Sequence, residues 1–362
     1  MFKGAFKGRR VLVTGHTGFK GSWLTRWLLD LGAEVTGLAL APDTDPNLFG
    51  LLGLEGAIRH HVLDIRDVEG VRRVVAEARP EVVLHLAAQP LVRLSYAEPK
   101  ATWDVNVGGT VNLLEALRAE GSARACVVVT SDKCYENREQ LWGYRETDAM
   151  GGHDPYSSSK GAVELAVASW RRSFFQDPAG MRLASGRAGN VIGGGDWAAD
   201  RIVVDFVKAI TTDRPVCLRN PQATRPWQHV LEPLSGYLWL AARLLEGEGQ
   251  ALAHGWNFGP RDESIVTVET LARGLVAAWG RGEVQVVSRP DQPHEAGLLR
   301  LDCTLAQARL AWHGVWDFSQ TVAQTVAWYK AHHEGGAMEA LTSQQIKTYE
   351  QDAVRAGLAW TE

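Results

Sequence analysis

The first half of the chain alternates strand-like and helix-like segments, and this alternation constrains the fold more than any other feature. Residues 10–14, RVLVT, form a β-branched run, and a glycine-rich turn leads from it into a helical pattern that ends at Gly32. Further strand-like runs follow at 33–40, 58–65, 81–88 and 123–131, with helical patterns at 67–78 and 108–119 among them. Such alternation indicates βαβ units, whose parallel sheet is covered on both faces. We therefore predict an α/β fold with a doubly wound parallel sheet.

The alternation ends in the middle of the chain. A helical pattern at 156–176 and a strand-like run at 181–191 continue it, and loop-rich segments with helical patterns at 202–212, 230–245 and 267–279 follow. We expect residues 1–190, joined by later returning segments, to form the sheet domain, and residues 191–335 to form a smaller mixed lobe. Residues 336–362 are expected to form a tail that ends in a surface or interface helix.

Composition argues against several classes of protein. The 38 Lys and Arg residues against 42 Asp and Glu residues give a net charge of −4, which argues against a nucleic-acid binder held by a basic field. No apolar run approaches the ~18 residues that span a bilayer, and the N-terminus lacks the apolar stretch of a secretory signal. The cysteines are scattered, so we expect reduced thiols in a cytoplasmic protein, without a disulfide framework or a metal site. They are Cys126, Cys134, Cys217 and Cys303.

The turn GHTGFKG, residues 15–21, places Gly15, Gly18 and Gly21 between the first strand and the first helix. Glycines there permit a tight turn and a close approach of the backbone to a pyrophosphate, while the helix N-terminus offers free N–H groups. The spacing is G-x-x-G-x-x-G rather than the commoner G-x-G-x-x-G, and glycines can also serve a turn alone. Because the motif lies in the first βαβ unit, it favours a Rossmann-type dinucleotide site.

The region after the second strand indicates which dinucleotide binds. NAD binders usually hold the ribose hydroxyls with an acid about 20 residues past the loop, but here Asp43 and Asp45 come late. No Lys or Arg lies between residues 33 and 57 to bind a 2′-phosphate, so NAD is favoured over NADP. Asp64, at the end of the third strand, could accept from the adenine amine or could cap the following helix, and both readings stay open.

A second motif supplies groups that handle protons. Tyr156 and Lys160 are four residues apart in a helical pattern, so they lie on one face. A neighbouring ammonium group and a nicotinamide cation would lower the pKa of the phenol, which suits the pair to removing a proton from an alcohol. An ordinary amphipathic helix would show the same spacing. The upstream glycine loop and Ser131, which follows the fifth strand, favour the functional interpretation.

Longer segments resemble a known family. The chain is similar to the extended short-chain dehydrogenase/reductases, and among them to the nucleotide-sugar 4,6-dehydratases, closest to those that act on CDP-glucose. The resemblance runs from residue 14 to about 240, and GHTGFKGSW and SDKCYEN are its discriminating pieces. Its other segments are HLAAQPLVRLSY, VNVGGTVNLLEA, WGYRETD, GGHDPYSSSKGAVEL, RAGNVIGGGDWAADRI and RPWQHVLEPLSGYL.

The resemblance implies an NAD-dependent hydro-lyase. A nucleotide-linked glucose, most closely CDP-D-glucose, would be oxidised at C4, lose water across C5 and C6, and regain hydride at C6. The product would be a 4-keto-6-deoxy sugar of the kind used in deoxysugar and lipopolysaccharide biosynthesis. Tyr156 would take the C4 hydroxyl proton, with Ser131 bonded to that oxygen and Lys160 holding the phenolate and the nicotinamide ribose.

The elimination requires an acid for the departing hydroxyl and a base at C5. Asp132 is the expected acid, and Lys133 stands where the dTDP-glucose relatives carry a Glu. Lys133 could be the C5 base or an electrostatic stabiliser of the enolate, and both roles stay open. Adjacent strand residues point to opposite faces, so Ser131, Asp132 and Lys133 can serve one site only if the strand ends and turns there. A solvated loop would explain the Asp–Lys pair more simply.

The resemblance also implies binding residues. Expected cofactor contacts are Gly15, Thr17, Gly18, Phe19, Lys20, Gly21, Asp64, Ile65, Ala87, Ala88, Asn106, Thr130, Tyr156 and Lys160. Expected substrate contacts are Gln89, Asn190, Arg201 and Arg225, of which the arginines can bind a diphosphate bidentately. Plainer alternatives are close packing for the two alanines, positioning of the central helix or a surface amide for Asn106, and surface cations for the arginines.

Two other functions compete with dehydration. A nucleotide-sugar 4-epimerase of the same fold needs Ser131, Tyr156 and Lys160 but has no use for an acid and a base at 132–133. A non-catalytic NAD-binding protein has no reason to keep all three residues. We expect a nucleotide-diphosphate sugar as the partner, no nucleic acid and no membrane. We also expect a homodimer or homotetramer formed through helices near 105–120 and 156–175.

Overall fold

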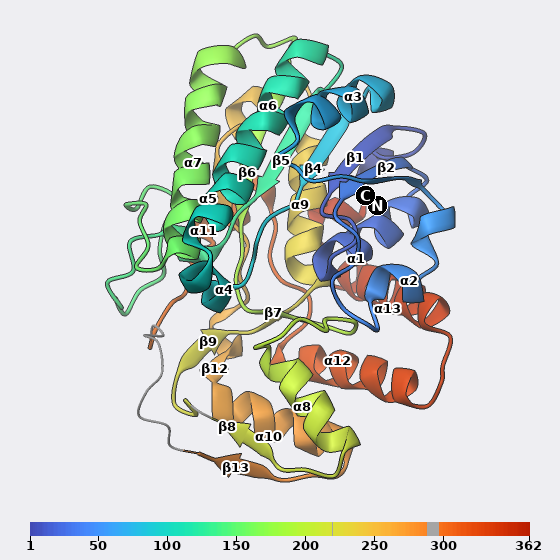
Figure 1. The fold of residues 1–362 in the computed structure, drawn as a ribbon, viewed down its shortest axis with the longest axis vertical. Helices are drawn as coiled ribbons and strands as arrows, with labels where there is room; N and C mark the ends of the chain where they lie inside the picture. The colour runs from blue at the N-terminus through green and yellow to red at the C-terminus, as the bar shows by residue number, and fades with distance from the viewer. Residues whose placement is uncertain (219, 288–296) are drawn as a thin grey trace.

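A seven-stranded parallel sheet forms the centre of the protein in a computed structural model that describes residues 1–218, 220–287 and 297–362 (Figure 1). Its order is β11-β6-β5-β4-β1-β2-β3, and every neighbouring pair is parallel. The strands are β1 (Arg10–Thr14), β2 (Glu34–Ala39), β3 (Arg59–Val62), β4 (Val82–His85), β5 (Ala125–Val129), β6 (Arg182–Arg187) and β11 (Gly255–Asn257). The strand order reverses between β1 and β4, which confirms the doubly wound sheet predicted from the sequence.

Alternate side chains of the strands enter two separate cores. Val11 and Val13 of β1 pack with one set of helices, whereas Leu12 packs with the other. The first set is α1 (Phe19–Asp30), α9 (Leu231–Leu244) and α13 (Met338–Arg355). The second set is α3 (Val68–Ala78), α6 (Gly109–Glu120) and α7 (Pro155–Phe174). A sheet buried on both faces explains why its strands read as nearly continuous apolar runs.

A smaller lobe lies beyond the carboxyl ends of the strands, at the bottom of Figure 1. Its helices are α8 (Ile202–Thr211), α10 (Val268–Trp279) and α12 (Phe318–His333), and α12 packs on α10. Its strand pairs are β7 (Val191–Ile192) with β10 (Gln228–His229), β8 (Val216–Leu218) with β13 (Val284–Val286), and β9 (Thr224–Pro226) with β12 (Ile265–Thr267). This lobe faces the edge of the sheet where a doubly wound fold binds ligands.

Short elements complete the chain. They are α2 (Leu48–Leu51), α4 (Val92–Ala97), α5 (Pro99–Trp103), α11 (Thr304–Leu310), a π-helical turn (Asp104–Gly108), and 3₁₀ turns at Phe2–Gly4, Leu54–Gly56, Asp132–Cys134, Gly249–Leu252, Asp262–Ser264 and Ala359–Thr361. Side-chain caps fix two helices near the site. Asp67 accepts from Gly70 N before α3, and Asp154 accepts from Ser157 N before α7.

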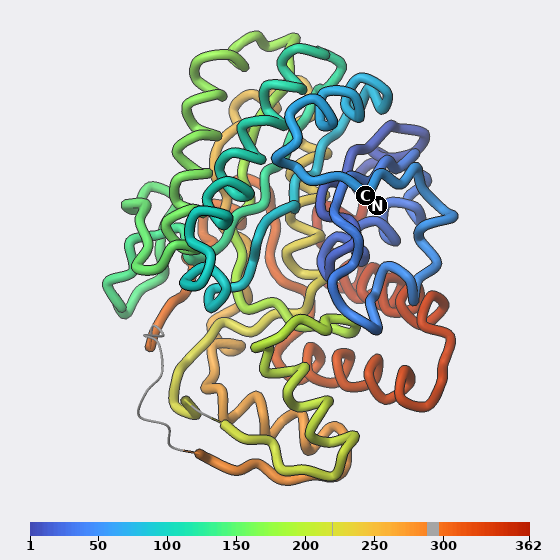
Figure 2. The backbone as a smooth tube through the Cα atoms, in the orientation of Figure 1, coloured from blue at the N-terminus to red at the C-terminus, as the bar shows by residue number. Residues whose placement is uncertain are grey.

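Several element boundaries differ from the sequence expectation. The run 181–191 is two strands rather than one, because β6 ends at Arg187 and Gly189 lies between β6 and β7. The helix expected at 108–119 begins earlier, since α5 runs through the π-helical turn into α6. The tail from residue 336 contains α13, which packs on α1: Trp27 Nε1 of α1 donates to Glu350 Oε1 of α13 at 2.9 Å. The two termini meet, with Lys3 N donating to Glu362 O at 2.7 Å (Figure 2).

The sequence-based domain boundaries at 190 and 335 stay a prediction. The sheet does receive later segments, since β11 is its edge strand and α9 packs on β5 and β6. Among the helices of the described residues, none is long and apolar enough to cross a membrane.

Candidate active site

The turn between β1 and α1 packs closely against the end of β4. Gly15 has a φ of +75° and donates from its N–H to Leu38 O. A Cβ at Gly15 would lie 2.7 Å from Ala87 N, and one at Gly21 would lie 2.0 Å from Gly15 O, so both positions require glycine. Gly18 precedes α1 and provides no side chain to cap its first turn. The first-turn N–H groups can therefore bind a phosphate, as a dinucleotide site requires.

Other residues of the predicted cofactor set lie around this turn. Thr17 Oγ1 donates to Leu40 O at 2.9 Å, and Phe19 packs against the larger core. Ala87 and Ala88 are half-buried after β4, and Ala87 N donates to Thr14 Oγ1 at 3.2 Å. Ala87 packs closely on the glycine turn, and the contact of both alanines with a cofactor stays a prediction.

A buried histidine that the sequence reasoning missed holds these strand ends together. His85 contacts Thr14 Oγ1 at 2.6 Å through Nδ1 and Thr110 Oγ1 at 2.9 Å through Nε2. Burial, together with the charge of Lys160, lowers the pKa of His85 to about 3. A neutral imidazole therefore bridges β1, β4 and α6 behind the site.

Asp64, which follows β3, does not have one of the two roles predicted for it, the cap of the next helix. The Asp64 carboxylate accepts from the guanidinium and the N–H of Arg66, which holds the pKa of Asp64 below its usual range. It does not cap α3, because Asp67 does so. Its contact with an adenine stays a prediction. Ile65 is buried against Gly109, where a Cβ would lie 2.3 Å from Ile65 Cγ2.

Asn106 joins the loop after β4 to the central helix α7. Its Oδ1 accepts from Gln89 N at 2.8 Å, and its Nδ2 donates to Gln89 O at 3.2 Å and to Ser159 Oγ at 2.8 Å. The Asn106 side chain is buried, so the alternative of an amide on the helix surface was wrong. The bond to Ser159 joins it to α7, the central helix. The Gln89 amide donates to Leu91 O and Thr102 Oγ1, and its contact with a substrate stays a prediction.

The strand β5 ends where the proton-handling residues begin. Ser131 is extended, and Asp132 to Cys134 form a 3₁₀ turn, so the chain turns as a shared site requires. Ser131 Oγ accepts from Lys133 N at 3.2 Å and donates to Asp132 Oδ1 at 3.0 Å. Asp132 is 2% exposed, and Asn190 Nδ2 donates to its Oδ2 at 3.3 Å. Asp132 is thus buried, which excludes a solvated loop for this carboxylate.

The helix α7 brings Tyr156 and Lys160 to the same place. Both are buried, and Lys160 Nζ donates to Val129 O at 3.4 Å. Burial raises the pKa of Tyr156 to about 12, and a hydrogen bond with the Ser131 side chain acts in the opposite direction. Lys160 is not among the groups that shift this pKa, so the lowering expected from Lys160 is not seen in the protein alone. Burial and the charge of Lys20 lower the pKa of Lys160 itself to about 8.

Lys20 of the glycine turn interacts electrostatically with these groups. Burial lowers its pKa to about 8, and the charges of Asp132, Arg201 and Asp196 act on it. Its side chain therefore belongs with the proton-handling residues as much as with a cofactor. Lys133 is half-buried, and within the described ranges its Nζ forms no hydrogen bond or ion pair, so both of its roles stay predictions.

The two arginines predicted to bind substrate differ in surroundings. Arg201 forms an ion pair with Asp196 at 3.9 Å, and its charge acts on Tyr156 and Lys20. Arg225 lies on β9 in the smaller lobe, and its Nη1 donates to Thr224 O and Gly297 O. Arg201 therefore lies near the catalytic candidates. Arg225 is held by backbone carbonyl groups of the smaller lobe, and the contact of either arginine with a substrate stays a prediction.

A buried ion pair links the elements of the site. Arg187 Nη2 of β6 donates to Glu164 Oε2 of α7 at 2.8 Å, and both side chains are 5% exposed. Thr130 Oγ1 donates to Glu164 Oε1 at 2.5 Å, and Arg187 Nη1 donates to the Tyr135 hydroxyl at 2.7 Å. Glu164 lies one turn beyond Lys160 on the same helix, a spacing that could have identified it from the sequence.

Two further features concern groups outside this cluster. Tyr237 of α9 is fully buried, its hydroxyl has no hydrogen-bond partner within the described ranges, and Asp132 and Tyr156 act on it electrostatically.

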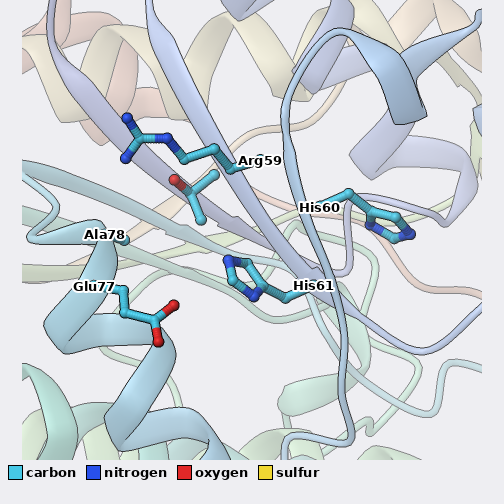
Figure 3. Close-up of a pocket in the computed structure, with 6 residues that line it drawn as sticks. Arg59, His60, His61, Glu77 and Ala78 are labelled. Carbon is cyan, nitrogen blue, oxygen red and sulfur yellow. The ribbon is translucent and has the colours of Figure 1, made fainter.

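The cavity in Figure 3 lies away from all of these residues, at the β3 edge of the sheet. Its lining is Thr36, Arg59, His60, His61, Glu77 and Ala78. In the part of the chain that the structure describes, no cluster of His, Cys, Asp and Glu could hold a metal ion.

The fold and this cluster define a class of protein. The chain belongs to the GDP-mannose 4,6 dehydratase family, whose sequence model matches residues 12–325. It is 50% identical over 352 residues to the CDP-glucose 4,6-dehydratase of Salmonella typhimurium, covering 96% of this chain and 98% of that protein. It is 27% identical to the dTDP-glucose 4,6-dehydratase of Xanthomonas campestris, over 88% of this chain and 92% of that protein.

Solved structures share the fold. The UDP-glucose 4-epimerase of Thermus thermophilus in complex with NAD matches with a TM-score of 0.76 and 26% identity, covering 89% of this chain and 99% of that one. The dTDP-glucose 4,6-dehydratase of Streptomyces venezuelae, a complex that contains NAD, matches with a TM-score of 0.75 and 22% identity, covering 92% and 99%. At these identities the likeness concerns the arrangement of the chain, and both dehydratases and epimerases share it.

Proposed function

We propose that this protein catalyses the NAD-dependent dehydration of CDP-D-glucose to the 4-keto-6-deoxy sugar, as a hydro-lyase. The observation that carries the proposal is the 50% identity, over nearly the whole of both chains, to a CDP-glucose 4,6-dehydratase. Incubation of the purified protein with CDP-, dTDP-, GDP- and UDP-glucose tests it. We expect a 4-keto product from CDP-glucose; an enzyme that turns over another nucleotide sugar in preference contradicts the substrate.

NAD fits the residues around the glycine turn. Gly15 and Gly21 leave no room for a side chain, and the uncapped first turn of α1 offers N–H groups to a pyrophosphate. No Lys or Arg between 33 and 57 could bind the 2′-phosphate of NADP. When bound, NAD supplies the acceptor for a hydride from C4 and the donor of a hydride to C6.

The residues that meet near β5 divide the proton transfers. Tyr156 takes the proton of the C4 hydroxyl, Ser131 bonds to the same oxygen, and the Lys160 ammonium stabilises the phenolate. Asp132 gives a proton to the departing C6 hydroxyl, and Lys133 acts as the base at C5 or stabilises the enolate. The burial of Tyr156, Lys160 and Asp132 supports this division, because exclusion of water strengthens each electrostatic contact.

The nearest alternative is a nucleotide-sugar 4-epimerase, since a solved epimerase shares the fold. An epimerase returns its hydride to C4 and releases no water. The buried carboxylate of Asp132 beside Ser131 favours dehydration, because an epimerase has no leaving hydroxyl to protonate. Mass spectrometry of the product separates the two reactions, since dehydration lowers the mass by one water and epimerisation leaves it unchanged.

We also propose a homo-oligomer in the cytoplasm, a dimer or a tetramer, built through the exposed faces of α6 and α7 and the residues beside them. Apolar side chains are exposed there, with Leu165 at 62%, Phe174 at 51% and Trp103 at 41%. A second copy that packs its own helices on this surface would bury them. Sedimentation equilibrium tests the proposal, and a monomer at micromolar concentration contradicts it.

A further inference from the structure

The proposed dehydration leaves a proton imbalance between two residues, and the following inference rests on that proposed function. Oxidation breaks the C4 O–H bond, and Tyr156 receives the proton. Elimination breaks the C5–H and C6–O bonds, forms a C5–C6 double bond, and consumes the Asp132 proton as the oxygen leaves in water. The base takes a proton from C5 and gives a proton back to C5, and the hydride removed from C4 is added at C6. Each turnover therefore leaves Tyr156 with one proton more and Asp132 with one fewer.

Ser131 lies between the two residues that must exchange this proton. Its Oγ donates to Asp132 Oδ1 at 3.0 Å, and its side chain lies near enough to the Tyr156 phenol to act on the pKa of that phenol. The backbone N–H of Lys133 donates to Ser131 Oγ at 3.2 Å, and this bond fixes the orientation of the Ser131 hydroxyl. Ser131, Asp132 and Tyr156 are 5%, 2% and 7% exposed, so bulk water has little access to the path.

We propose that Ser131 returns the proton from Tyr156 to Asp132 at the end of each turnover. Its oxygen accepts the phenolic proton while its own proton passes to the carboxylate. The O–H bond of Tyr156 breaks, an O–H bond on Asp132 forms, and Ser131 ends as it began. The proton taken from the C4 hydroxyl is thus the one that later leaves in water, and no proton from solvent is needed.

Charged and titratable groups from several elements face this path. Lys20 of α1, Tyr237 of α9 and Cys134 of the same turn interact with the Asp132 charge. Asp154, at the cap of α7, and Arg201 act on Tyr156 in opposite directions. In the protein alone, burial keeps the proton on Tyr156. A cation bound beside the phenol shifts the balance toward the phenolate and hence moves the shared proton toward Asp132.

The test measures how elimination depends on pH. Full-length wild type, Ser131→Ala and Ser131→Thr, each loaded with NAD, are mixed with CDP-glucose from about pH 6 to about pH 8.5, and absorbance at 340 nm is followed. Its rise reports C4 oxidation and its decay reports elimination with hydride return. We expect a pH-independent decay in wild type. In Ser131→Ala the decay should fall about tenfold per pH unit, because the proton for elimination must then come from solvent, where its concentration changes by that factor. Ser131→Thr keeps the hydroxyl and should restore the wild-type profile.

A substrate with another leaving group provides the control. Fluoride leaves as an anion, so CDP-6-deoxy-6-fluoroglucose does not require the Asp132 proton and should give a pH-independent decay in Ser131→Ala. The proposal is overturned if Ser131→Ala slows the rise alone by one factor at every pH. It is also overturned if the decay in wild type falls about tenfold per pH unit, because Asp132 would then take its proton from solvent even with Ser131 present. If wild type makes no 4-keto product from CDP-glucose, the proposed function fails instead, and that result is distinct from either outcome.

Discussion

The carboxylate of Asp132 lies directly over Gly189, and a Cβ at Gly189 would be 1.9 Å from Asp132 Oδ2. No adjustment of a few tenths of an ångström relieves such a contact, because the same Cβ would be 2.1 Å from Asp132 Cγ. Gly189 follows β6, and Asp132 follows β5, so the site depends on the close approach of two neighbouring strand ends. A side chain at 189 must therefore displace the proposed acid.

We expect Gly189→Ala to slow elimination by about tenfold or more while C4 oxidation continues, since a displaced acid loses its contribution to the transition state. Absorbance at 340 nm would then accumulate after mixing with CDP-glucose. Gly56→Ala is the matched control, because no atom lies within 4 Å of the Cβ it would carry. Equal slowing of both steps in Gly189→Ala, or unchanged kinetics, contradicts the placement of Asp132 as the acid.

The buried pair of Glu164 and Arg187 supports the fold around the site. Glu164→Gln leaves the Arg187 guanidinium buried without a charged partner, and removing one partner of a buried pair costs about 3–5 kcal/mol. Urea denaturation of both proteins measures the loss in the free energy of unfolding. Glu69→Gln breaks the exposed pair with Arg72 and should cost less than about 1 kcal/mol. If the two variants lose the same amount, the buried pair contributes no more than a surface pair.

The sequence was most informative where function depends on local backbone geometry. The glycine turn could be recognised because Gly15 and Gly21 must lack side chains within a single strand–turn–helix unit. The turn after β5 could be anticipated for the same reason: Ser131 and Asp132 are adjacent in the chain, and only a turn lets both serve one site. The doubly wound parallel sheet, though not the order of its strands, followed from the alternation of strands and helices.

The sequence was least informative where distant segments meet. Arg187 and Glu164 lie on different elements, and no local pattern shows that β6 places its guanidinium beside α7. For residues 336–362 we predicted only a surface or interface helix, and no local pattern shows that Glu350 and Tyr349 of α13 pack on α1. The sequence suggested Asp64 as a possible cap for α3, whereas the carboxylate that accepts from Gly70 N belongs to Asp67. The electrostatic interaction of Lys20 with Asp132 likewise joins two segments that are distant in the sequence.

Lys20 should set the alkaline limit of activity. Lys160 must be protonated to stabilise the phenolate, so activity falls as pH rises through the pKa of Lys160, which burial and the charge of Lys20 lower to about 8. Lys20→Met removes that charge, so the pKa of Lys160 and the alkaline limb of kcat/KM should move to higher pH. Lys20→Arg keeps the charge and should keep the limb in place. A limb that stays in place, or moves to lower pH, in Lys20→Met would show that Lys20 does not act on Lys160.

The buried hydroxyl of Tyr237 can be tested for a hydrogen-bond partner through its effect on stability. It is fully buried and without a partner within the described ranges, so Tyr237→Phe removes no hydrogen bond and should leave the free energy of unfolding unchanged or raise it by up to about 1 kcal/mol. Tyr349→Phe, on the opposite side of α9, removes a buried hydroxyl bonded to Glu232 at 2.8 Å and should lower it by about 1–3 kcal/mol. Urea denaturation measures both variants. A loss in Tyr237→Phe as large as that in Tyr349→Phe would mean that an ordered water or Asp132 satisfies the hydroxyl, which would add Tyr237 to the groups that position the acid.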